Sequence, residues 1–112
     1  MRYKVVIVPF PFDDLSATKV RPAVCLTEAL GSRKHIVVAF ITSQAPDVLL
    51  ASDYPIAREH PDFSLTGLRV SSTLRLHRLI TVSTSLLRRE LGELSGEMQT
   101  AVSDKLRKLF GL

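Results

Sequence analysis

An arginine directly before a proline, Arg21-Pro22, opens an apolar run in this sequence, and a threonine, Thr42, closes the next one. Arg75 and His77 stand two residues apart in a later run of the same kind. Guanidinium groups bind phosphate oxygens through paired hydrogen bonds, and a hydroxyl can donate to the charge of a phosphorus-centred transition state. RNA carries its own nucleophile, the 2′-OH. Such a site could therefore cleave RNA by positioning, charge stabilisation and one proton acceptor.

Other chemistries have less support in the residue pattern. His35, His60 and His77 are scattered and lack the spacing of zinc ligands. No glycine pattern of a P-loop or a dinucleotide site is present. Cys25 is the single cysteine and stands among apolar residues, so we expect a buried free thiol in a reducing compartment rather than a nucleophile. The expected site uses no metal and no cofactor.

Positive charge is concentrated in one part of the chain. Fifteen Lys and Arg against eleven Asp and Glu give a net charge of +4. No acidic residue occurs between Asp62 and Glu90, and the arginines of this interval are Arg69, Arg75, Arg78, Arg88 and Arg89. A local basic zone of this kind is the footprint expected of a surface that meets phosphates.

The length of 112 residues predicts a single domain over residues 1–112 that buries one core without a disulfide. No apolar stretch is long enough for a signal peptide or a membrane span, so we expect a soluble, cytoplasmic protein.

Apolar, β-branched runs predict strands at residues 3–8, 22–27, 35–42 and 70–80, with one short strand inside the irregular segment 47–66. A short helical segment is expected over residues 85–91, stopped by Gly92. A final helix follows, with Ser95 as its N-cap, Lys105, Arg107 and Lys108 near its end and Gly111 beyond it. Five or six short strands and a terminal helix predict a mainly β protein, a small, strongly bent antiparallel sheet or barrel that the helix closes.

The turn between the second and third runs sets an expected register. If Gly31 and Ser32 are its central residues, facing residues have numbers that add up to 63, and Arg21 faces Thr42. The residue before a proline is held extended, so Pro22 restricts the backbone of Arg21. We therefore expect the guanidinium and the hydroxyl to share one small area, unless a bulge shifts the pairing.

Alternation along residues 70–80 sorts their side chains. Leu74 and Leu76 fall on one face of the expected strand, and Thr73, Arg75 and His77 fall on the other. The basic zone is therefore expected to present a flat face.

At this point the chain resembles the MazF/PemK (Kid) family of toxins from bacterial type II toxin–antitoxin modules. The segments that carry the resemblance are VIVPFPFDDLSATKVRPAV at 6–24, AFITSQ at 39–44, GL at 67–68, STLRL at 72–76 and LGELS at 91–95. The resemblance implies an SH3-like barrel, a homodimer, and a metal-independent, sequence-specific endoribonuclease. It implies cleavage of single-stranded RNA to a 2′,3′-cyclic phosphate and a 5′-OH, and inhibition by an antitoxin whose acidic segment lies in the RNA groove.

The resemblance also implies roles for individual residues. Arg21 matches the proton donor or acceptor and charge stabiliser, Thr42 the transition-state hydroxyl, and Arg75 an arginine with an acid role. His77 stands where many relatives have an aspartate base, and histidine titrates near neutral pH. Tyr3-Lys4 replaces a common Gly-Asp or Gly-Glu, so the turn before the first strand is expected to be lost. Further RNA contacts are expected from Lys19, Ser43, Gln44, Arg69, Ser72 and Arg78.

Each candidate has a plainer interpretation. Arg21 could form a surface ion pair with Asp13 or Asp14, and Ser43 with Gln44 could simply build a turn. Thr42 and Arg75 could be ordinary strand residues, and His77 an ordinary half-exposed histidine. Phe10 and Phe12 are expected in the core or a dimer contact, with base stacking as the lesser alternative.

A second class of function also stays open. A CcdB-like topoisomerase poison on the same barrel would act through a protein surface and its C-terminal end, and the ending KLFGL is similar to such a terminus. The chain has no tryptophan, however, and this alternative leaves the RP and ITSQ features unexplained. A MazF relative that has lost its activity is the third alternative.

Overall fold

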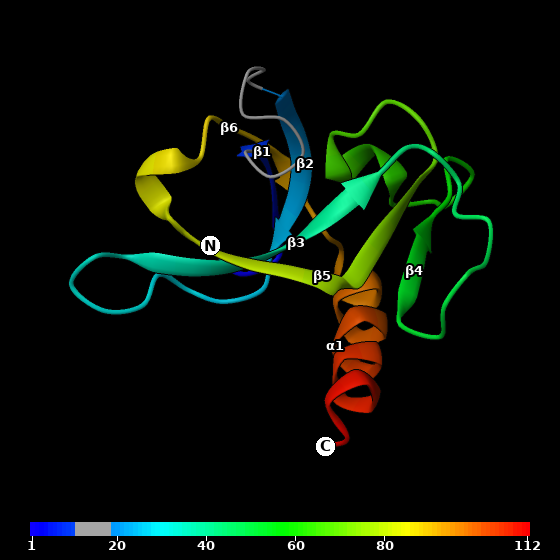
Figure 1. Cartoon of the computed structure of the whole chain (residues 1–112). Helices are drawn as coiled ribbons and strands as arrows, with labels where there is room; N and C mark the ends of the chain where they lie inside the picture. The colour runs from blue at the N-terminus through cyan, green and yellow to red at the C-terminus, as the bar shows by residue number, and fades with distance from the viewer. Residues whose placement is uncertain (11–18) are drawn as a thin grey trace.

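The computed structural model describes residues 1–10 and 19–112, with the side chain of Phe10 outside the described part (Figure 1). The expectations for the side chains of Phe10, Phe12, Asp13 and Asp14 therefore lie outside the described residues. The strands are β1 (Lys4–Phe10), β2 (Lys19–Cys25), β3 (His35–Thr42), β4 (Asp53–Ile56), β5 (Ser72–Ser83) and β6 (Arg89–Glu93). Two 3₁₀ turns, η1 (Phe63–Thr66) and η2 (Thr84–Leu86), and the helix α1 (Gly96–Phe110) complete the described structure.

All six strands form one antiparallel sheet in the order β4-β5-β3-β2-β1-β6. The sheet is curled into a half-barrel, and α1 starts beneath β5 and projects away from the sheet toward the C-terminus (Figure 1). The prediction of a mainly β fold with small antiparallel strands and a C-terminal helix is confirmed. The described part of the chain contains no helix that is long and apolar enough to cross a membrane.

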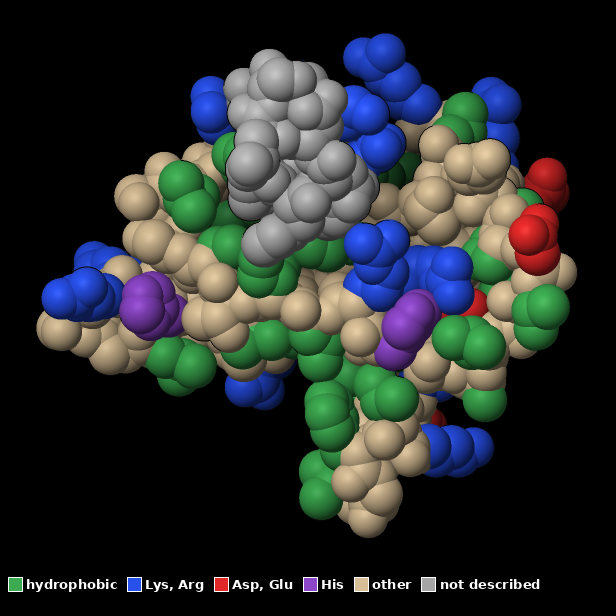
Figure 2. Space-filling view, viewed as in Figure 1, with side chains coloured by type: hydrophobic (Ala, Val, Ile, Leu, Met, Phe, Trp, Pro, Cys, Tyr) green, Lys and Arg blue, Asp and Glu red, His purple; other side chains and the backbone are tan. Residues whose placement is uncertain are grey.

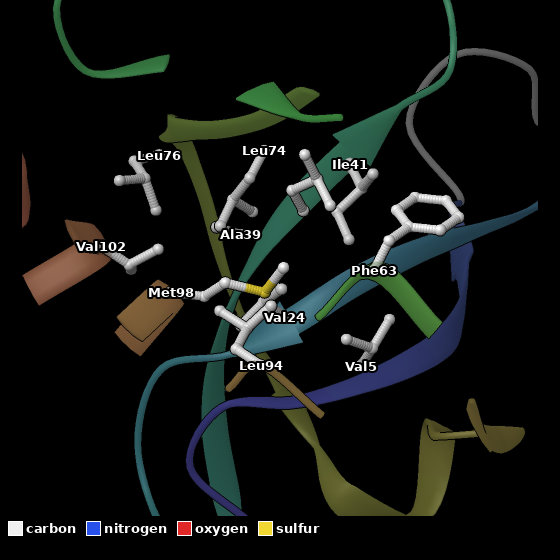
Figure 3. Close-up of a cluster of buried hydrophobic side chains, with 11 residues drawn as sticks. Val5, Val24, Ala39, Ile41, Phe63, Leu74, Leu76, Leu94, Met98 and Val102 are labelled. Carbon is white, nitrogen blue, oxygen red and sulfur yellow. The ribbon is translucent and has the colours of Figure 1, made fainter. Parts of the chain in front are cut away.

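The strands bury apolar side chains on both faces because successive side chains point to opposite sides of a sheet. On the face covered by α1, Val5, Val24 and Leu74 pack around Met98 and Val102 of the helix, and all five are fully buried (Figure 3). The other face carries a second buried cluster, made by Val6, Val8, Ala23, Cys25, Ile36, Val38, Phe40 and Val82. The half-barrel is therefore built from strands that are apolar on two sides.

Strand β5 bends sharply in its middle (Figure 1). Ala39 of β3 pairs with Leu79, but the next residue, Phe40, pairs with Arg75. Residues 76–78 of β5 thus have no partner on β3, and they form a large bulge. Bulges bend the strand that carries them and re-aim its side chains. Up to this bend, Leu74 and Leu76 lie on the buried face of the strand as predicted, since both are fully buried.

The final helix forms as predicted. Ser95 caps it, with its Oγ accepting a hydrogen bond from the backbone N–H of Met98 at 3.3 Å. Gly111 adopts the left-handed conformation (φ 69°) that ends many helices, and its N–H and that of Leu112 bond to carbonyls of the last turn.

The helical segment predicted for residues 85–91 is wrong. The chain forms the short turn η2, capped by Ser83, and then enters β6, which pairs with β1. Long-range strand pairing decides this conformation, and local helical spacing does not. Gly92 does not stop a helix but lies inside β6, where a Cβ would overlap the backbone of Leu65 and Thr66 in η1.

The turn before β1 is kept, contrary to the expectation. Tyr3 adopts φ 69°, the left-handed region that favours glycine, and the N–H of Lys4 bonds to the carbonyl of Met1 at 3.0 Å. The backbone of Tyr3 is held from two sides, because its N–H donates to Cys25 and its carbonyl accepts from Leu94. These bonds impose the conformation that the side chain disfavours.

The two edge strands differ from the inner ones. β4 contains the exposed Pro55, which cannot donate a backbone hydrogen bond. β6 carries the exposed charges Arg89, Glu90 and Glu93. The apolar pattern of the inner strands stops at both edges.

Gly92→Ala is expected to lower the free energy of unfolding by about 1–3 kcal/mol, because the added Cβ must push apart the backbones of β6 and η1. Urea denaturation measures the change. Gly96→Ala is the matched control, since a Cβ there meets nothing within 4 Å and alanine suits a helix. An unchanged midpoint for Gly92→Ala would contradict this packing.

Candidate active site

A groove opens where β2 and β3 separate. The two strands pair at Cys25↔Val38, Val24↔Ala39 and Ala23↔Phe40, and no pair follows. The next residue of β2 is Pro22, which has no N–H with which to extend the ladder. The resulting groove has a volume of about 650 Å³ and is lined by residues of β2, β3, β5 and the loops that follow β3 and precede β5.

The predicted register is confirmed in the body of this hairpin, where the numbers of paired residues add up to 63. The tip differs: Leu30 pairs with His35, and the N–H of Lys34 bonds to the carbonyl of Gly31 at 3.2 Å. The turn thus has four residues, and residues 27–29 absorb the offset. The prediction that Arg21 and Thr42 form a strand pair is wrong, because β2 and β3 have separated at this point. Both residues nevertheless line the groove.

Eight of the ten predicted site residues line this groove: Arg21, Thr42, Ser43, Gln44, Arg69, Ser72, Arg75 and Arg78. The other two, Lys19 and His77, do not line it. Among the described residues that line the groove, four are arginines and Asp47 is the single acidic residue. Lys and Arg side chains gather with a histidine over the bend of β5 in the space-filling view (Figure 2). The groove is therefore suited to an anion.

The hydroxyl of Thr42 is engaged in the turn that follows β3. Its Oγ1 accepts a hydrogen bond from the N–H of Gln44 at 3.1 Å and lies 3.3 Å from the carbonyl of Gln44, to which it can donate. This arrangement fixes the position of the oxygen. A phosphate oxygen in the groove could take the place of the Gln44 carbonyl as the acceptor.

The four arginines are held to different degrees. Arg21 is exposed, and within the described residues its side chain has no hydrogen-bond or ion-pair partner. The ion pair of Arg21 with Asp13 or Asp14 falls outside the described part. Arg75, in contrast, donates from its Nε to Oδ1 of Asp53 at 2.9 Å. Its side chain is only 22% exposed, so one guanidinium of the groove is tightly fixed.

Asp53 is a residue of this region that the sequence did not point to. It begins β4, directly opposite Arg75 of β5, and its side chain is 0% exposed. Oδ2 accepts the N–H of Leu50 at 2.8 Å, and Nδ1 of His77 lies 3.9 Å from Oδ1. The last distance is too long for a hydrogen bond. No local signal identifies Asp53, because its role depends on the pairing of β4 with β5.

One His/Asp/Glu trio occurs among the described residues. Ligand-type atoms of His60, Asp62 and Glu97 all lie within 4.8 Å of one another, although the spacing of the three histidines alone had indicated no metal set. None of the three lines the groove. Nδ1 of His60 already accepts the N–H of Asp62 at 3.0 Å, and Glu97 lies in the first turn of α1.

Cys25 is buried in the second apolar cluster, as predicted. Desolvation by this burial raises the pKa of the thiol from 9.0 to about 11. A thiol in this state is a poor nucleophile, because the reactive species is the thiolate. The structure thus agrees with its exclusion from the chemistry.

The thiol of Cys25 should resist alkylation by iodoacetamide at pH 8 and react readily in urea. The folded thiol keeps its proton up to about pH 11, whereas the unfolded one releases it near 9.0. Its contribution to the free energy of unfolding is therefore complete below pH 9 and is lost as the pH rises from about 9 to about 11. Urea denaturation at several pH values in this range measures whether the free energy of unfolding falls as the pH rises. Cys25→Ala, which lacks the thiol, is the control. Equal pH dependence of the two proteins would contradict it.

Fold and groove together define a small half-barrel protein with a cationic groove. The sequence profile of the PemK-like, MazF-like toxins of type II toxin–antitoxin systems matches residues 1–110. The chain belongs to this toxin family. A search of curated protein sequences finds no significant match.

Three solved structures with the same fold come from mycobacteria. The Mycobacterium tuberculosis toxin MazF-mt6 is 22% identical over 97% of each chain, with a TM-score of 0.74. An endoribonuclease in complex with its cognate antitoxin from a mycobacterial species is 13% identical, covering 100% of this chain and 95% of that chain, with a TM-score of 0.72. Another mycobacterial endoribonuclease is 15% identical over 100% and 91% of the two chains, with a TM-score of 0.68. At these identities the likeness establishes the fold.

Proposed function

We propose that this toxin binds single-stranded RNA in the groove and cleaves it through attack of the RNA's own 2′-OH. The observation that carries the proposal is the composition of the groove, whose described residues include four arginines and the Thr42 hydroxyl beside a single carboxylate. Guanidinium forks suit the oxygens of a phosphodiester. Two structural neighbours are endoribonucleases, which supports the same activity for this chain.

The proposed reaction makes a bond from the 2′-oxygen to phosphorus and breaks the bond to the 5′-oxygen. Arg21 and Thr42 donate to the non-bridging oxygens, where charge grows in the transition state. Arg75 donates a hydrogen bond to the departing 5′-oxygen, which takes a proton from solvent water as it leaves. His77 takes the proton of the 2′-OH, which requires the ribose to extend beyond the groove and over the bend of β5. The products are a 2′,3′-cyclic phosphate and a 5′-OH.

The described groove residues include no set of metal ligands, and the proposed chemistry uses none. Cations and a hydroxyl replace the charge stabilisation that a metal ion provides in other nucleases. The remaining lining residues, Ser43, Gln44, Arg69, Ser72 and Arg78, are proposed to contact the RNA on either side of the scissile bond. Lys19, at the start of β2 and outside the groove, is proposed to contact a more distant phosphate.

The proposed partners follow from the family and from the charge of the groove. An antitoxin whose acidic segment enters the groove would neutralise its arginines and block the RNA. A structural neighbour solved with its cognate antitoxin supports this partnership. A homodimer in the cytoplasm is part of the same proposal, and sedimentation of the purified protein tests the dimer.

Wild-type protein is expected to cut mixed-sequence single-stranded RNA in EDTA and to leave the matching DNA intact, because DNA lacks the 2′-OH. Arg21→Ala and Thr42→Val should each slow cleavage by about 100-fold or more, the usual effect of losing one donor to a transition-state oxyanion. Gel analysis of the products and circular dichroism of each variant are the measurements.

Arg107→Ala is the matched control, since it removes an exposed arginine from the last turn of α1. It should cut RNA as fast as wild type. The proposal is wrong if wild type cuts no RNA, or if folded Arg21→Ala cuts as well as Arg107→Ala.

Phe110→Ala separates the ribonuclease from the topoisomerase poison. Phe110 is 57% exposed at the end of α1, where a partner protein could contact it. We expect RNA cleavage and growth arrest to be unchanged in this variant, because Phe110 does not line the groove. Growth assays with and without induction make the comparison. Loss of toxicity with full RNA cleavage would favour the poison.

A further inference from the structure

We infer that Asp53 is a positioning residue for the proposed reaction, which fixes the guanidinium of Arg75 in the orientation that the scissile phosphate requires. The inference rests on the proposed function, since it concerns how one of its cations is held. It assigns a role to a residue that does not itself line the groove.

The carboxylate of Asp53 is completely buried and fully engaged. Its Oδ1 accepts from Nε of Arg75 at 2.9 Å, and its Oδ2 accepts from the N–H of Leu50 at 2.8 Å. The N–H of Asp53 in turn donates to the carbonyl of Leu50 at 3.0 Å. A buried charge is tolerated when it is paired and hydrogen-bonded in this way. Asp53 therefore has one defined position.

This position determines how Arg75 meets the groove. A guanidinium has five N–H donors in a rigid planar fork. Asp53 occupies the Nε–H, while Arg75 lines the groove. The donors that remain for the groove are the four N–H bonds of the two terminal nitrogens, which match two oxygens of one phosphate. A guanidinium that is fixed before the substrate arrives loses little freedom during the reaction.

Strand pairing keeps the two residues together. Asp53 and Arg75 are direct partners in the β4–β5 ladder, and Arg75 is also the partner of Phe40 at the bulge of β3 and β5. The same oxygen of Asp53 lies 3.9 Å from Nδ1 of His77. An imidazolium formed when His77 takes up a proton would thus stand beside a carboxylate. The distance of 3.9 Å is too long for a hydrogen bond, so Asp53 is inferred to act through Arg75.

The test compares cleavage with binding in Asp53→Asn. Positioning predicts single-turnover cleavage at least about 10-fold slower than wild type, because the guanidinium is no longer fixed by a charge. It also predicts that affinity for uncleavable 2′-O-methyl RNA stays within about 3-fold or increases, since the substitution removes a negative charge near a polyanion. A merely structural role would weaken cleavage and binding together.

A double-mutant cycle with Arg75→Lys shows whether Asp53 acts through Arg75. Lysine keeps the charge but offers no fork to the phosphate. We expect Asp53→Asn to have no further effect on cleavage in the Arg75→Lys background. Multiplicative losses, a normal cleavage rate in folded Asp53→Asn, or a parallel loss of binding would each overturn the inference.

A spectroscopic measurement keeps the inference separate from the proposed activity. If wild type cuts no RNA, the proposed function fails, and the orientation of Arg75 is read from the exchange of its Nε–H with water by NMR. Slow exchange in wild type and rapid exchange in Asp53→Asn would support the positioning. Equal exchange in the two proteins would overturn it.

Discussion

Backbone pairing around Phe40 decides where the side chains of the groove lie. On one side of this residue the β2–β3 ladder ends, and on the other side the β3–β5 register jumps to Arg75. The separation on the first side opens the groove, and the bulge on the second bends β5 and turns its cations outward. Phe40 itself is buried in the second apolar cluster, so packing holds the strands at the point where both ladders change.

Two of the groove's cations are held by different physical means. Arg75 is bound by a buried carboxylate, and removing one partner of such a pair typically costs about 3–5 kcal/mol because the other charge is left buried. Arg21 is exposed, and its order comes from a backbone that Pro22 restricts. The first arrangement ties the site to the stability of the fold, whereas the second leaves a side chain that can adjust to a ligand.

Local patterns predicted much of this molecule. The hairpin register was predictable because its strands are close in sequence, and α1 because Ser95 and Gly111 mark its ends. Features that depend on pairing between distant segments of the chain were not predictable from the sequence. The strand β6 needs β1 as its partner, the role of Asp53 needs the β4–β5 ladder, and the bulge before Leu79 leaves no mark in the sequence. Eight of the ten predicted site residues line one groove, because they lie on or next to the apolar runs that form β2, β3 and β5, and their roles stay predictions.

The edge strands have a consequence for the behaviour of the protein at high concentration. An open sheet can recruit further chains through the unpaired N–H and C=O groups of its edge strands. Pro55 removes one such donor from β4, and the exposed charges of β6 would have to be brought against those of a neighbouring copy. Both features work against edge-to-edge association of further copies.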